Sequence, residues 1–173
     1  MTKTAPYSVT RQTGDIEIRS YPVQLLATVS GSSDDVMFMV LLRYISGYNR
    51  PRTEIAMTAP VITGTTIPMT APVISGPGTM SFVMPEEYTI PTLPEPLDPA
   101  VTIREVPART LAVIRFFGSA DEQNVRKMTE LLNSTLKKEG MTIIGIPFLM
   151  QYNSPWTPGF LRRNEIGVEI QPG

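Results

Sequence analysis

Residues 16–29 and residues 101–114 repeat one pattern of hydrophobic and polar positions. Arg, Pro, Leu and Ala recur in register in the two stretches, and the β-branched positions match in type. Each stretch alternates β-branched residues on either side of its proline, Pro22 or Pro107, which predicts two strands joined in a hairpin by a proline-centred turn. A short Gly-Ser segment and a helical pattern follow each copy. The chain therefore reads as two copies of one unit of strand, turn, strand and helix.

Both predicted helices carry start and stop signals. Ser33 precedes two acidic residues at the start of the first helix, and Ser119 forms a capping box with Glu122 at the start of the second. Gly47 and Gly140 stand where the two helices are expected to end. Further strands are expected at 79–84, 148–152 and 164–170.

Together these elements predict an α+β fold, a distorted antiparallel β-barrel that carries two helices. The barrel would be built from a strand-strand-helix-strand unit, duplicated with pseudo-two-fold symmetry. A chain of 173 residues is expected to form one domain. We expect the repeat halves at about 7–90 and 100–171, with the Pro-rich stretch 91–99 as their connection.

The two predicted helices differ in their polar faces. The second has apolar residues at helical spacing with charged residues opposite, whereas the first has no polar residue from Val36 to Leu42. A helix that is apolar all round is expected to be buried all round, and a sheet covers only one of its sides. We expect a loop, a second copy of the chain or a ligand in a groove to cover the other side.

A shorter repeat follows the first helix. The sequence Met-Thr-Ala-Pro-Val-Ile occurs at 57–62 and again at 69–74. Each run carries a proline, so neither is expected to be a central strand of a regular sheet. Two such runs would form a flap beside the first helix, and methionine side chains suit a large, flat apolar guest.

Composition excludes several kinds of chemistry. The chain has no Cys and no His, which excludes disulfides, zinc fingers, thiol nucleophiles and imidazole bases. With 15 basic and 16 acidic residues, it lacks the basic excess expected of a protein that binds nucleic acid or an anionic membrane. No apolar leader and no long apolar run stand out, so we expect a cytoplasmic protein.

Several motifs resemble those of the SOUL haem-binding family. They occur in order along the chain, at Ile45–Asn49, Glu54–Val61, Met80–Tyr88, Ile103–Val113 and Arg162–Glu165. The resemblance extends from about residue 7 to residue 170. It implies the same two-helix barrel, and it implies a non-enzymatic carrier or buffer that binds haem or another tetrapyrrole.

The resemblance also implies where a tetrapyrrole would bind. Family members hold haem through an axial His, or bind porphyrins without one in an apolar groove beside the first helix, with basic residues near the propionates. Because this chain has no His, binding without an axial His and without an assigned metal ligand is expected, and Met or Tyr remains the alternative axial ligand. The matching positions are Phe38, Met39, Leu42, Arg43 and Met57, followed by Arg50 and Arg52 as second choices.

Other interpretations stay open. The same barrel could be a ligand-sensing or scavenging module for a different flat apolar molecule, as a monomer or a weak homodimer. Tyr88 beside Glu86 and Glu87 could form a hydrolase site, although adjacent residues in a turn usually face solvent. Arg163 either forms a structural ion pair or hydrogen bond at the start of the last strand, or reaches an anionic ligand.

Overall fold

The computed structural model describes residues 3–31, 33–50, 54–64, 78–152, 158 and 161–172. The chain divides into two compact units, each assembled from two segments. Unit 1 consists of Met1–Ala5 and Val23–Pro107, and unit 2 consists of Pro6–Pro22 and Ala108–Gly173. The Pro-rich stretch 91–99 therefore belongs to unit 1.

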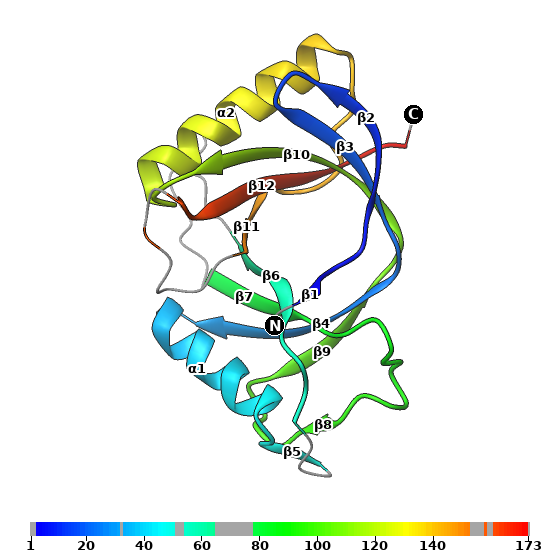
Figure 1. Cartoon of the computed structure of the whole chain (residues 1–173), viewed down its shortest axis with the longest axis vertical. Helices are drawn as coiled ribbons and strands as arrows, with labels where there is room; N and C mark the ends of the chain where they lie inside the picture. The colour runs from blue at the N-terminus through cyan, green and yellow to red at the C-terminus, as the bar shows by residue number, and fades with distance from the viewer. Residues whose placement is uncertain are drawn as a thin grey trace. The chain divides into compact units, whose positions relative to one another are not determined.

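Unit 1 pairs an antiparallel sheet with one helix. Its elements are β1 (Lys3–Thr4), β4 (Gln24–Gly31), α1 (Asp34–Ile45), β5 (Asn49–Arg50), β6 (Thr58–Gly64), β7 (Gly78–Val83), β8 (Glu95–Pro96) and β9 (Thr102–Val106). The strand order is β6-β7-β4-β9, with β1 parallel to β6 and with β5 and β8 paired separately. The helix α1 packs against β4 and β7 (Figure 1). Inward side chains of α1, β4 and β7 contribute most of the core of the unit.

Unit 2 has the same plan. Its elements are β2 (Ser8–Thr13), β3 (Ile16–Tyr21), β10 (Arg109–Phe117), α2 (Glu122–Lys138), β11 (Phe148–Gln151) and β12 (Arg163–Ile170). The strands are antiparallel in the order β2-β3-β10-β12-β11. The helix α2 packs against β10 and β12 (Figure 1). The α+β class with two helices is confirmed, while closure into a barrel stays a prediction.

The predicted hairpins are wrong, because the two strands around each proline lie in different units. In unit 1, β4 pairs with β9 and places Leu26 opposite Arg104. In unit 2, β10 pairs with β3 and places Leu111 opposite Arg19. In the sequence repeat, Arg19 matches Arg104 and Leu26 matches Leu111, so the two units pair their strands in the same register. Each unit takes the first strand of its pair from the other copy of the repeat. A tight two-residue hairpin turn needs a positive φ, which proline cannot adopt.

The helix caps agree with the sequence in part. Ser33 caps α1 by accepting a hydrogen bond from the backbone N–H of Val36, as predicted. The predicted capping box at α2 is wrong, because Asp121 is the N-cap, and its carboxylate accepts from Asn124 N–H at 2.8 Å. Asp is as good a cap as Ser and stands directly before the first helical residue. Within the described ranges, no helix is long and apolar enough to cross a membrane.

The strands at 79–84, 148–152 and 164–170 are confirmed as β7, β11 and β12. The first Met-Thr-Ala-Pro run contributes β6, whose register against β7 shifts between Thr58 and Val61, around Pro60. The strand β6 nevertheless has a partner on both sides, β7 and β1, so the expectation that this run would not be a central strand is wrong. The shift in register is where the ladder accommodates Pro60. The second run, at 69–74, lies outside the described residues. The strand β2 was not expected, because its residues are exposed and show no apolar alternation.

Candidate functional site

The outer side of α1 carries apolar residues that are exposed. Val36 and Met39 are 62% and 52% exposed, and Arg43 continues the same face at helical spacing. The opposite face is buried against the sheet through Met37, Leu41, Tyr44 and Ile45. The sheet thus covers one side of α1, and what covers the other side stays a prediction.

Three of the predicted site residues pack against the core of unit 1. They are Phe38, Leu42 and Met57, and all three are half-buried. The ring of Phe38 meets Phe82 edge-to-face, with ring centroids 5.4 Å apart. We call Val36, Phe38, Met39, Leu42 and Arg43 the α1 surface. On this surface Val36 and Met39 are exposed, whereas Phe38 and Leu42 pack against the core of unit 1.

A cation is held at the end of this surface. The guanidinium of Arg43 lies over the ring of Tyr48, with its carbon 4.6 Å from the ring centroid. The backbone places the two together, because Tyr48 N–H donates to the Arg43 carbonyl at 2.9 Å and Gly47 takes the positive φ of 121° that this turn requires. Arg43 remains exposed. It can therefore meet an anionic group beside the apolar stripe.

The second-choice arginines are less informative. Arg50 is exposed in the short strand β5, opposite Glu95 of β8. Arg52 lies outside the described residues. The structure thus brings Phe38, Met39, Leu42 and Arg43 together on one helix, and it places Met57 against the same core.

A buried clasp fixes the last turn of α1. The hydroxyl of Tyr44 donates to the Pro94 carbonyl at 2.6 Å, and the side-chain amide of Asn49 donates to the Tyr44 carbonyl at 2.7 Å. Burial, with a smaller contribution from Tyr88, raises the pKa of Tyr44 to about 12, so the hydroxyl keeps its proton. The clasp ties the Pro-rich stretch to the helix turn that carries Arg43. Proline richness alone gave no indication of this role.

Unit 2 contains a buried ion pair of a different kind. Arg19 and Glu165 are 1% and 0% exposed and form two parallel hydrogen bonds of 2.8 and 2.7 Å. Arg163 adds a third contact to Glu165 at 2.9 Å. Burial acts to raise the pKa of Glu165, but hydrogen bonds from Arg19, the nearby Tyr152 hydroxyl, the Arg19 charge and a hydrogen bond from Arg163 lower it to about 2. The structural role predicted for Arg163 is confirmed by this pairing.

Aromatic rings surround the pair. The Arg19 guanidinium lies 4.1 Å from the centroid of the Tyr7 ring and donates to the Tyr21 hydroxyl at 3.0 Å. Arg163 lies at the same distance over Tyr152. Burial raises the pKa of Tyr152, and the neighbouring Tyr21 and Glu165 raise it further, so its hydroxyl stays neutral. Each buried charge has a partner of opposite sign, which favours a structural role over ligand binding.

The alternative hydrolase residues are not assembled into a cluster. Glu86 and Glu87 are exposed, whereas Tyr88 is half-buried and packs against the core of unit 1. Among the described residues, no group of three or more acidic side chains could hold a metal ion. The α1 surface is therefore the better candidate for binding in unit 1.

The architecture defines an α+β protein with a repeated sheet-and-helix plan and an apolar helix surface. The chain belongs to the SOUL heme-binding protein family, whose model matches residues 2–169. It is 31% identical over 158 residues to human Heme-binding protein 2, a match that covers 87% of this chain and 76% of the relative.

Two solved structures share the fold at low sequence identity. The C-terminal domain of EcmrR aligns with a TM-score of 0.65 at 9% identity, covering 96% of this chain and 99% of that domain. A hydrolase from Listeria innocua aligns with a TM-score of 0.60 at 10% identity, covering 94% of each chain. At these identities the likeness concerns the fold alone.

Proposed function

We propose that this chain binds haem or a related porphyrin on the α1 surface, as a carrier or buffer that catalyses no reaction. The observation that carries the proposal is the exposed apolar stripe of Val36 and Met39, which ends at Arg43. Membership of a haem-binding family supports the choice of ligand. The name of the human relative agrees with it.

The dimensions and chemistry of the α1 surface fit a porphyrin. From Val36 to Arg43 the helix rises by about 10 Å, which is comparable with the width of the macrocycle. One face of the macrocycle would lie on Val36 and Met39, with Phe38 and Leu42 along its edge. A propionate would then meet Arg43, whose guanidinium is already positioned over Tyr48. Met57 stands directly before β6 and packs against the same core.

Iron is not needed for this mode of binding. The chain has no His or Cys to coordinate it, and Met39 could offer only a weak thioether ligand. Affinity would come from buried apolar area. A few hundred Å² at roughly 25 cal/mol/Å² gives several kcal/mol before association costs, so the affinity should be micromolar at best. Haem and metal-free porphyrin should therefore bind with similar affinity.

Titration with hemin and with metal-free protoporphyrin IX tests the proposal. We expect saturable shifts of the Soret band, with dissociation constants within about threefold of each other. The substitution Arg43→Glu should raise both constants about fivefold or more, because it places a like charge beside the propionate. Arg104→Glu is the matched control, since Arg104 is another exposed arginine of unit 1.

Two results would overturn the proposal. If neither compound binds, the chain does not act on porphyrins, and another flat apolar molecule becomes the better candidate. If Arg43→Glu and Arg104→Glu have equal effects, porphyrin binds elsewhere. Tight binding of hemin alone would show that an axial ligand carries the affinity.

A further inference from the structure

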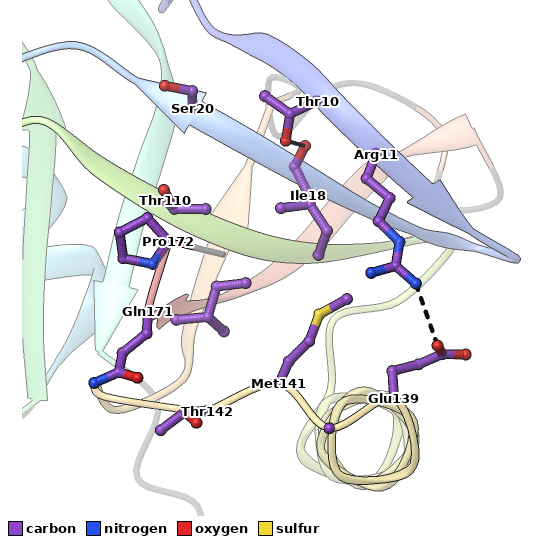
Figure 2. Close-up of a pocket in the computed structure, with 12 residues that line it drawn as sticks. Thr10, Arg11, Ile18, Ser20, Thr110, Glu139, Met141, Thr142, Gln171 and Pro172 are labelled. Carbon is purple, nitrogen blue, oxygen red and sulfur yellow. Dashed lines mark hydrogen bonds and ion pairs between the residues drawn. The ribbon is translucent and has the colours of Figure 1, made fainter.

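Unit 2 contains a cleft of about 680 Å³ that the porphyrin proposal does not use (Figure 2). The sheet forms one side through β2, β3, β10 and the residues at the end of β12, and residues 139–142 form the other side. The volume lies within the range of ordinary small-molecule sites. Because α2 ends at Lys138 and Gly140 turns the chain with a φ of 74°, the helix leaves this end of the sheet open.

The interior of the cleft is both apolar and hydroxyl-bearing. Figure 2 shows Ile18 on the sheet side and Met141 on the loop side, both pointing into the space between them. Ile170 adds apolar surface, and Ser20 and Thr110 contribute hydroxyl groups. This mixture suits a guest with a short apolar body and one polar end.

The mouth of the cleft carries one charge of each sign. Arg11 and Glu139 form an ion pair of 3.3 Å, and their side chains are 56% and 34% exposed (Figure 2). An exposed pair of this kind contributes little to stability, so it separates easily. An adjoining hollow is lined by Arg109 and Glu169, again one charge of each sign. The net charge around the cleft is therefore unchanged by this hollow.

The backbone that carries the negative charge is held in place by the end of α2. Glu139 is the C-cap of α2, and its N–H donates to the Thr135 carbonyl at 2.9 Å. The C-terminal end of a helix carries a partial negative charge that favours cations. Arg11, in contrast, reaches the cleft from the exposed strand β2 on a long, flexible side chain. It can move into solvent while the backbone of Glu139 and the end of α2 stay in place.

We propose that this cleft binds a small amphipathic organic cation. Its ammonium group would take the place of Arg11 beside Glu139 and the end of α2. Its apolar body would lie against Ile18, Met141 and Ile170. The guest would therefore compete with Arg11 for the carboxylate of Glu139.

Matched probes of opposite charge test the proposal by NMR titration of the full chain. We expect 4-phenylbutylammonium to shift the backbone amide signals of Gly140, Met141 and Thr110, and 4-phenylbutyrate to leave them unchanged. Glu139→Gln should weaken binding of the cation about tenfold or more, because a charged hydrogen bond is lost. Arg11→Gln should tighten binding about two- to threefold, because the competing cation is removed.

Two further variants separate occupation of the cleft from a general effect of charge. Ser20→Trp fills the cleft from an exposed strand position and should abolish binding. Lys138→Gln removes a nearby exposed charge that does not line the cleft and should leave the affinity within about twofold. Spectra of each variant report folding directly.

The proposal is overturned if 4-phenylbutyrate binds in preference and depends on Arg11. It is equally overturned if the cation produces no shifts at these amides, or if Glu139→Gln binds as well as the unchanged protein.

Discussion

The helices α1 and α2 stand at matching places in the two repeated halves, but their outer faces differ. On α1, Val36 and Met39 form an exposed apolar stripe. On α2, Leu131 is exposed by 46%, but charged residues such as Lys127 and Glu130 surround it along the helix. Both helices bury one face against a sheet, so folding alone does not require the stripe on α1. The exposed stripe on α1 is the feature on which the proposed porphyrin site depends.

The opposite faces of the two sheets differ as well. Arg19 and Arg104 match in the repeat, yet Arg19 is buried against Glu165 and Arg104 is exposed. On the same face of the sheet in unit 1, the hydroxyls of Thr28 and Ser81 lie 2.8 Å apart. Among the residues that the structure describes, unit 2 has a buried ion pair and unit 1 shows none. Stability should respond to charge chiefly in unit 2, and porphyrin binding to substitutions chiefly in unit 1.

The largest expected effect is on stability in unit 2. Glu165→Gln removes the partner of a buried guanidinium and should lower the free energy of unfolding by about 3 to 5 kcal/mol, as measured by urea denaturation. Arg104→Gln, at the matching exposed position, should change it by less than about 0.5 kcal/mol. If Glu165→Gln lowers the free energy of unfolding by less than about 1 kcal/mol, the buried pair does not stabilise unit 2.

A somewhat smaller effect follows from pH. The pKa of Glu165 is lowered from 4.5 to about 2, so its contribution to stability is present above pH 4.5 and is lost as the pH falls toward 2. The loss should amount to about 3 kcal/mol beyond that of Glu165→Gln over the same range. Parallel curves of unfolding free energy against pH for the two proteins would contradict the assignment.

The elements of this fold could be predicted from local pattern, but their pairing could not. Alternation located β3, β4, β7 and β12, and Ser33 and Gly47 marked the ends of α1. The exchange of strands was missed because pairing of β4 with β9 and of β3 with β10 joins residues far apart in the chain. The local pattern also favoured Ser119 as a cap over Asp121, which stands closer to the helix.

The candidate site shows the same limit. The uninterrupted apolar run from Val36 to Leu42 indicated an unusual helix, and family resemblance directed attention to Arg43. The position of Arg43 over Tyr48 depends on a turn at Gly47, and the buried pair of Arg19 and Glu165 joins two distant strands. Such contacts follow from tertiary structure rather than from residue spacing.

The most direct test of the central claim is a hemin titration of two matched variants, Met39→Asp and Leu131→Asp. Each places a carboxylate at a half-exposed apolar position on the outer face of one helix. If α1 alone binds porphyrin, Met39→Asp raises the dissociation constant about tenfold or more and Leu131→Asp changes it by less than about twofold. Equal effects, or a larger effect of Leu131→Asp, would contradict the assignment of the porphyrin site to α1.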